Sequence, residues 1–181
     1  MKTKAILAIL LLSLCGMAYA HTVKIMGKAS YFYPQEEAFR DIYEGGLRYG
    51  GEIEVAIWKG IGIWLGGDYF FKKGELTFTK EKTSLWIIPA YFGLKFRLPE
   101  KSVSPYFGLG AGYFFFKEDN PIGKVDEGKI GGIAQLGFTF SVGGPIFFDL
   151  QFTYTYCEVK PSGVKAQLGG LQGGVGLGFQ F

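Results

Sequence analysis

The chain has 181 residues, a net charge of +3, 29 glycines and 18% aromatic residues. This length allows one domain behind a leader segment, and so small an excess of basic residues excludes a broad basic surface for nucleic acid. Glycine and aromatic residues are spread along the whole chain, which favours glycine-punctuated strands over helices.

The first twenty residues have the pattern of a secretory signal peptide. Two lysines precede an apolar run over residues 5–14, and Ala-Tyr-Ala at the end of this segment is a small-x-small cleavage site. The run is too short to cross a bilayer as a helix, and no later stretch reaches the roughly 18 apolar residues that a spanning helix needs. We therefore expect residues 1–20 to be cleaved and residues 21–181 to form the mature domain.

Eight segments of alternating apolar and polar residues follow the leader. The seventh is the clearest, because its even-numbered residues from Ile146 to Tyr156 are apolar while Asp149, Gln151 and Thr153 are polar. Strands of roughly 10 to 14 residues are longer than those of ordinary soluble sheets and match a tilted bilayer crossing. The strands are expected at residues 22–32, 46–58, 60–71, 84–97, 103–116, 129–142, 145–157 and 166–181.

The connections between these segments alternate in length. Long loops follow the odd-numbered strands, at residues 34–46, 72–83, 117–129 and 158–163, and short turns follow the even-numbered ones. An even number of strands with long loops on one side only is typical of an outer-membrane barrel. The expected fold class is therefore all-β: a transmembrane, antiparallel, eight-stranded up-and-down β-barrel, with both termini on the short-turn, periplasmic side.

One face of the expected sheet carries no Lys, Arg, Asp, Glu or His. An Arg or Lys that faces lipid at the bilayer midplane costs about 2 to 4 kcal/mol, so this uncharged face indicates hydrocarbon as its solvent. Aromatic residues gather at both ends of the face, as two interfacial girdles. They are Tyr31, Tyr49, Tyr69, Trp86, Tyr113, Tyr154 and Tyr156 at the long-loop end, and Phe96, Phe107, Phe140, Phe148, Phe179 and Phe181 at the short-turn end.

The opposite face holds the charged residues of the strands, and we expect it to line the lumen. The register of the first hairpin would bring Lys28 near Glu52 and Lys24 near Glu54. A lone buried charge costs several kcal/mol, so the preferred interpretation is a plug of ion pairs and hydrogen bonds. The alternative makes Glu52 and Glu54 a catalytic pair or a gate for ions. The predicted network consists of Lys24, Lys28, Arg48, Glu52, Glu54, Asp68, Lys95, Arg97 and Asp149.

The first long loop carries a helical pattern. Phe39, Ile42 and Tyr43 fall at positions i, i+3 and i+4, and Gly45-Gly46 follows as a stop signal. A short amphipathic helix is expected, with its apolar stripe folded over the barrel mouth or lying at the lipid interface. The functional alternative is that these three side chains meet a partner or an apolar ligand.

The second long loop is rich in lysine. Its cations could contact lipopolysaccharide phosphates, or the segment could be an ordinary solvated loop. The candidate contacts are Lys72, Lys73, Lys80 and Lys82, with Glu75 and Glu81 between them.

Three segments carry a resemblance to a known family: SPYFGLGAGYFFF at 104–116, FFDLQFTYTY at 147–156 and GGVGLGFQF at 173–181. With them, the chain resembles the small eight-stranded OmpA/OmpX/OmpW-type outer-membrane barrels of Gram-negative bacteria. The resemblance implies an outer-membrane location and contact with outer-membrane lipid. It also implies recognition by the assembly machinery through a last strand that ends in Phe179 and Phe181. This architecture serves anchors, adhesins, pores and lipid-modifying enzymes, so function must be argued separately.

The single histidine argues against catalysis. Barrel-type lipid A deacylases and palmitoyl transferases are similar in size, but those families depend on a histidine in the barrel or at its rim, and the only one here is His21. A Ser–His or metal constellation lacks its second member, so we expect no cofactor and no metal. The preferred hypothesis is a monomeric, non-enzymatic barrel with an envelope-structural role or a surface-interaction role through its loops. The alternatives are a narrow pore or transporter for small or hydrophobic solutes, and a secreted lipocalin-like binder with an apolar interior.

Overall fold

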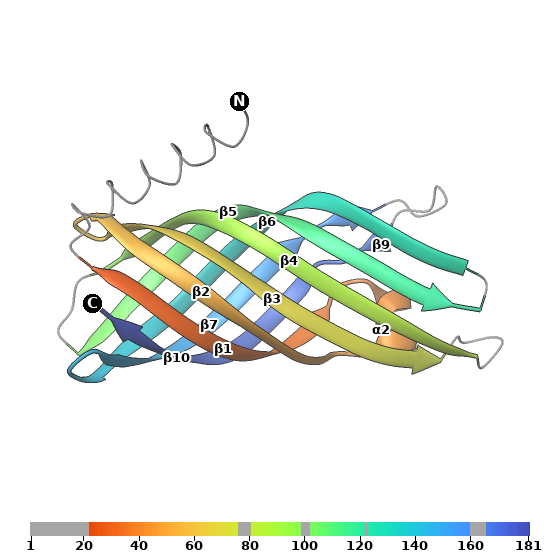
Figure 1. Cartoon of the computed structure of the whole chain (residues 1–181), viewed down its shortest axis with the longest axis horizontal. Coiled ribbons are helices and arrows are strands. Elements are labelled where there is room, and N and C mark those ends of the chain that lie inside the picture. The colour runs from red at the N-terminus through yellow and green to blue at the C-terminus, as the bar shows by residue number, and fades with distance from the viewer. Residues whose placement is uncertain (1–21, 76–80, 99–101, 122, 160–165) are drawn as a thin grey trace, which may run out of the picture.

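The chain folds into a closed antiparallel barrel, shown side-on in Figure 1. The computed structural model describes residues 22–75, 81–98, 102–121, 123–159 and 166–181, so the expected signal peptide, His21 and Lys80 lie outside the described residues. None of the described helices is long and apolar enough to cross a membrane. The barrel strands are β1 (Val23–Pro34), β2 (Gly46–Trp58), β3 (Ile61–Glu75), β4 (Lys82–Arg97), β5 (Val103–Asn120), β6 (Gly123–Gly143), β7 (Ile146–Tyr156) and β10 (Gly170–Gln180).

The order of strands around the barrel follows the chain. Neighbours pair in the order β1-β10-β7-β6-β5-β4-β3-β2, and the last strand closes against the first, with Ile25 opposite Phe179. Closure leaves no unpaired strand edge among the eight barrel strands, which explains why the terminal segment alternates like the others. The all-β, eight-stranded antiparallel fold predicted from the sequence is confirmed.

The two-residue period of each strand sorts its side chains between the outside and the interior. Along β7, exposed and buried residues alternate without a break, so that Phe148 and Leu150 point outward while Asp149 and Gln151 point into the lumen. The outward face predicted from the sequence is the exposed face in every barrel strand, and its large apolar residues are 37% exposed or more at most positions. Along β7 the interior and the exterior of the barrel therefore have opposite chemistry.

The third long connection is not a loop. Strands β5 and β6 stay paired from Val103 and Phe140 as far as Asn120 and Gly123, so the loop predicted at 117–129 is wrong. The pattern fails there because charged residues stand on both faces of this hairpin, Glu118 and Glu127 on the inward face and Lys117 and Asp126 on the outward one, which removes the alternation that marks a strand. The second connection is shortened in the same way, because Glu75 pairs with Lys82 at the tip of β3 and β4. Figure 1 shows these hairpins at the same end of the barrel as α2.

The first and fourth connections have structure of their own. The predicted amphipathic helix is present as α2 (Glu37–Tyr43), and its side chains Phe39 and Tyr43 are buried. In the fourth connection, the short strands β8 (Glu158–Val159) and β9 (Ala166–Gln167) pair with each other. Backbone hydrogen bonds join Leu168 N to Cys157 O, so this small sheet continues the β7–β10 hairpin beyond the barrel.

The helix ends one residue earlier than the glycine signal predicts. Glu44, not Gly45, has the positive φ of 55°, and its amide donates to the carbonyl of Arg40 at 2.8 Å. A side chain at such a φ is strained by about 1 kcal/mol or more, and glycine is not. We expect Glu44→Gly to raise the free energy of unfolding by about 1 kcal/mol, measured by urea titration of the refolded barrel in detergent micelles. Glu44→Ala is the matched control, because it also removes the carboxylate but keeps the strain; equal effects of the two variants would contradict the prediction.

Candidate functional site

The charged lumen residues form a connected network in the half of the barrel nearer the short turns. At its centre, the ammonium group of Lys95 forms an ion pair with Glu52 and lies 3.6 Å from Glu54 Oε2. Gln135 Nε2 donates to the second oxygen of Glu52 at 3.3 Å. Lys95 is 1% exposed, so this pair lies in a medium where each charge depends on the other for its solvation.

Arg97 extends the network toward the short turns. Its guanidinium binds both carboxylate oxygens of Glu54, with Nη2 2.7 Å from Oε2 and Nε 3.3 Å from Oε1. It also donates from Nη1 to the hydroxyl of Thr139 at 2.6 Å, and Thr139 in turn donates to Asp149 at 2.8 Å. The second oxygen of Asp149 accepts from Tyr106 at 2.6 Å. Five strands, β2, β4, β5, β6 and β7, are thereby tied together across the lumen by charge-assisted hydrogen bonds.

A second cluster lies nearer the middle of the barrel. Lys28 forms an ion pair with Asp68 at 3.2 Å and a hydrogen bond with the hydroxyl of Tyr91, which itself donates to Asp68 at 3.0 Å. The prediction that Lys28 lies near Glu52 is wrong: the residue opposite Lys28 is Gly50, and Glu52 lies opposite Met26. Lys24 does lie opposite Glu54.

The network predicted from the sequence lacks the uncharged side chains that hydrogen-bond to the lumen carboxylates. Tyr91, Tyr106, Gln135 and Thr139 are buried and hold the carboxylates of Asp68, Asp149 and Glu52. All four lie on the inward register, among the charged positions. A hydroxyl or amide side chain at an inward-facing position is therefore the sequence signal that would have identified these four residues.

The half of the lumen nearer α2 is apolar. Phe32 and Phe70 pack edge to face, with ring centroids 5.3 Å apart, and Phe39 of α2 packs on Phe32 at 6.3 Å. The helix therefore covers the barrel mouth and places its apolar stripe against the interior. The cluster consists of Phe32, Phe39, Tyr43, Phe70, Leu85, Ile87, Phe114, Phe116, Cys157, Val159 and Leu168, with Ile42, Val125 and Ala166 packed against it.

Hydrogen bonds at Tyr43 hold the helix in the mouth. The Tyr43 hydroxyl donates to Glu118 Oε1 at 2.8 Å and lies 2.8 Å from the hydroxyl of Thr83. Burial, with the carboxylate of Glu118 adding to it, raises the pKa of Tyr43 well above its usual value, so the hydroxyl stays a donor at neutral pH. At the opposite side of the helix, Tyr154 donates to Gln35 at 2.8 Å.

The free space at the centre of the polar network is small, and a wider hollow of about 240 Å³ lies at its short-turn end beside Lys24, Glu54 and Arg97. A cavity of about 10 Å³ lies among the side chains of the network, which is at the lower limit for one water molecule. Toward the other end, the apolar cluster and α2 close the lumen. The cavity is lined by Lys24, Met26, Glu52, Glu54, Lys95, Arg97, Phe147 and Asp149.

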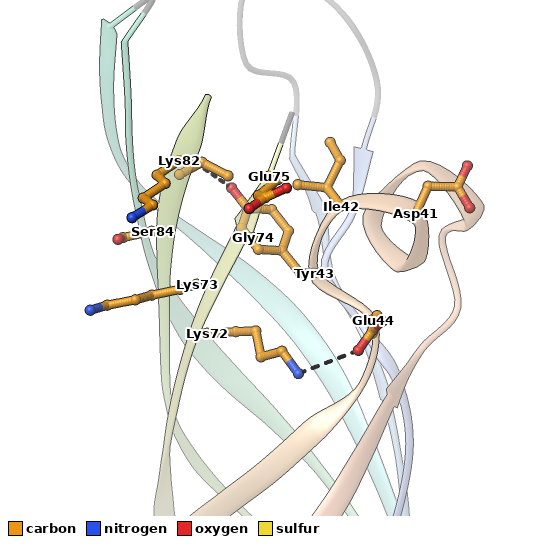
Figure 2. Close-up of a pocket in the computed structure, with 11 residues that line it drawn as sticks. Asp41, Ile42, Tyr43, Glu44, Lys72, Lys73, Gly74, Glu75, Lys82 and Ser84 are labelled. Carbon is orange, nitrogen blue, oxygen red and sulfur yellow. Dashed lines mark hydrogen bonds and ion pairs between the residues drawn. The ribbon is translucent and has the colours of Figure 1, made fainter. Parts of the chain in front are cut away.

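A larger cleft of about 650 Å³ lies outside the lumen, between α2 and the tips of β3 and β4 (Figure 2). Lys72 and Lys73, which the sequence places together in a loop, are residues of β3 whose side chains point to opposite faces of the strand, and that placement in a loop is wrong. Lys72 turns toward the helix, where it donates to Gly45 O at 3.0 Å and lies 3.7 Å from Glu44 (Figure 2), whereas Lys73 is exposed on the outward face. Three carboxylates and three ammonium groups line the cleft, those of Asp41, Glu44, Glu75, Lys72, Lys73 and Lys82.

Every residue predicted for the two aromatic girdles lies on the outside of the barrel. The structure adds Tyr33, Phe71 and Phe115, which are also exposed on the outward face near α2; Tyr33 lies one residue beyond the predicted first strand, and the other two lie within predicted strands. Phe71 and Trp86 lie side by side on β3 and β4, with ring centroids 5.1 Å apart.

The comparison with protein families agrees with this architecture. The model of the outer membrane protein β-barrel domain matches residues 6–181. The comparison with curated proteins gave no match.

Several solved structures share the fold. The outer membrane protein OprG of Pseudomonas aeruginosa is 16% identical, with a TM-score of 0.73 over 90% of this chain and 97% of that one. Ail of Yersinia pestis, in complex with the heparin analogue sucrose octasulfate, is 18% identical, with a TM-score of 0.58 over 88% and 97%. The N-terminal barrel domain of P. aeruginosa OprF is 15% identical, with a TM-score of 0.54 over 90% and 98%. At these identities the likeness shows the fold alone.

Proposed function

The chain belongs to the outer membrane protein β-barrel domain family, and from that premise we propose that it is a non-enzymatic barrel of the Gram-negative outer membrane. In this role its filled interior stabilises the fold and its extracellular rim makes the contacts. In barrels of this type the short turns face the periplasm and the long connections face outward. The α2 end is then the extracellular end.

The observation that carries this proposal is the filling of the lumen in both of its halves. Ion pairs such as Lys95–Glu52 and Arg97–Glu54 close the periplasmic half, and the apolar cluster under α2 closes the extracellular half. An ion would have to break buried charge pairs and then cross an apolar layer, and each step costs several kcal/mol. This filling supports an anchoring or surface role over the rival function of a pore or transporter.

The extracellular rim offers a paired hairpin as its contact surface. The ends of β5 and β6 carry exposed charges of both signs, and Lys124 forms an ion pair with Asp119 at 2.9 Å. A backbone that is paired to its tip loses less conformational freedom on binding than a free loop does. On the outward face, Lys73 and Lys117 stand beyond Phe71 and Phe115, a position suited to lipopolysaccharide phosphates above an apolar acyl surface.

Planar-bilayer recording tests the proposal against a pore. We expect no steady openings from the wild-type barrel, and none from Phe39→Ala/Tyr43→Ala, because that variant loosens only the apolar half and leaves the ion-pair half closed. Steady openings of the wild type whose conductance changes in Lys24→Gln or Glu52→Gln would show that ions pass the network. The protein would then be a pore.

A further inference from the structure

Arg48 stands apart from the other lumen charges because it has no hydrogen-bond acceptor. The residue is 1% exposed, and its Nε, Nη1 and Nη2 atoms have no partner among the described residues. Burial of an unpaired guanidinium in a protein interior costs several kcal/mol. The position therefore needs a partner that the side chains around it do not supply.

The immediate neighbours of Arg48 stabilise a positive charge but accept no hydrogen bond. Its Cζ lies 3.9 Å from the ring centroid of Phe32 and 5.4 Å from that of Phe70. The face of an aromatic ring attracts the cation electrostatically, yet it leaves the N–H groups of the guanidinium without a lone pair to bind. These contacts fix the guanidinium at the boundary between the apolar cluster and the polar network.

Other unpartnered donors lie along the row of cross-strand pairs that contains Arg48. Arg48 on β2 is opposite Ser30 on β1, Ser30 is opposite Gly174 on β10, and Gly174 is opposite Gln151 on β7. Ser30 and Gly174 are small, so neither β1 nor β10 places a bulky side chain between Arg48 and Gln151. Neither amide atom of Gln151 has a partner, and Nε2 of the adjacent Gln172 has none, although its Oε1 accepts from Ser30 at 3.4 Å.

The lumen network has five cations, Lys24 and Arg48 besides the three with ion pairs, against four carboxylates, so one positive charge is in excess. Arg48 is the fully buried cation without an ion pair among the described residues. Lys28, Lys95 and Arg97 have ion pairs with Asp68, Glu52 and Glu54. Asp149 is held by two hydroxyls in the periplasmic half. Asp68 is two residues along β3 from the position opposite Arg48; its Oδ1 is engaged by Lys28 and Tyr91, its Oδ2 has no hydrogen-bond partner, and no ion pair joins it to Arg48 among the described residues. One positive charge and several N–H donors thus remain along one row of cross-strand neighbours.

We propose that Arg48 binds a small monovalent inorganic anion, of the size of chloride, with the side-chain amides of Gln151 and Gln172 as additional donors. The anion balances the excess positive charge of the lumen, and it accepts hydrogen bonds from the N–H groups that have no side-chain acceptor. Complete burial selects a small ion over a phosphate or a sulfated sugar. The bound anion is then a part of the folded barrel, independent of any transport through it.

Binding to the folded barrel alone makes stability depend on anion concentration. Urea unfolding of the refolded protein would be followed at constant ionic strength while chloride replaces gluconate, which is too large for a buried site. Above the dissociation constant, each tenfold rise in chloride is expected to raise the free energy of unfolding by about 1.4 kcal/mol in the wild type. Arg48→Met, which fits between Phe32 and Phe70 without a charge, is expected to show no dependence.

Arg40→Met is the matched control for loss of an arginine. Arg40 lies on α2 and donates to the backbone carbonyls of Pro34 and Gln35, so its loss should leave the chloride dependence of the wild type intact. Equal chloride dependence in the wild type and Arg48→Met, or none in either, would overturn the proposal.

Should Arg48→Met fail to fold, crystals of the wild type grown in bromide decide the question. An anomalous peak within hydrogen-bond distance of the Arg48 guanidinium supports the site. Ordered water alone at that position rejects it.

Discussion

Replacing Lys95 by methionine is expected to lower the free energy of unfolding by about 3 to 5 kcal/mol, the cost of breaking a buried ion pair from one side. Lys95 is the charge on which Glu52 and Glu54 both depend, with an ion pair to the first and a distance of 3.6 Å to the second. Its removal leaves Glu52 with the amide of Gln135 as its one partner among the described residues. Urea unfolding in detergent micelles, followed by tryptophan fluorescence and by the heat-dependent gel mobility of the barrel, measures the loss.

A double variant separates the ion pair from the volume of the side chain. Lys95→Met/Glu52→Gln removes both charges of the pair, so most of the lost stability should return even though the methionine remains. Lys59→Met is the matched control, since Lys59 is exposed in the β2–β3 turn and its loss should change stability by a few tenths of a kcal/mol. A double variant as unstable as Lys95→Met would mean that packing of the lysine stem, rather than its charge, holds the network.

The fold could be predicted because a membrane barrel has two solvents. Leu150 and Gln151 are adjacent in the sequence and meet opposite environments, and this contrast repeats along each membrane-spanning segment. The prediction fails where this contrast between the two faces is lost. At Lys117 and Glu118 both faces of the hairpin carry charge, so two paired strands were predicted as a loop.

The pairing of charges inside the barrel could not be predicted to the same degree. Sequence alternation shows that Lys28, Glu52 and Asp68 all point inward, but the partner of each depends on the stagger between strands and on side chains that reach across the lumen. Lys28 reaches Asp68 on β3, which is not the strand beside it, because Gly50 on the intervening β2 has no side chain in the way. A glycine opposite a charged residue is thus a sign that the charge reaches past the neighbouring strand.

The division of the lumen follows from the same register. Inward residues near the short turns are charged, and those near α2 are phenylalanine, leucine and isoleucine, so the helix meets an apolar surface when it folds into the mouth. Phe39 and Tyr43 on one helical face match that surface. The sequence predicted the stripe but left its target open between the barrel, the lipid and a partner; the structure places it on the barrel.

The outward face yields the second large effect: Leu150→Arg is expected to cost about 2 to 4 kcal/mol of unfolding free energy for the barrel refolded into lipid bilayers. Leu150 lies between the two girdles, two residues from Phe148 and four from Tyr154, and its cross-strand neighbours are Val175 and Phe138. An arginine there would have to leave its charge in hydrocarbon or draw water and headgroups toward the midplane. Reversible urea titration of the barrel in vesicles measures the difference.

Depth along the same face provides the control. Ile130 is also exposed outward, but it lies opposite Tyr113 of the extracellular girdle, so Ile130→Arg can place its charge among the headgroups and should cost about 0 to 1 kcal/mol. A water-exposed surface would treat the two arginines much more nearly alike, because both side chains are exposed, Leu150 by 40% and Ile130 by 77%. Equal costs would therefore refute hydrocarbon as the solvent of this face. A difference of about 2 kcal/mol or more would show that the cost of a charge on this face depends on its depth in the bilayer.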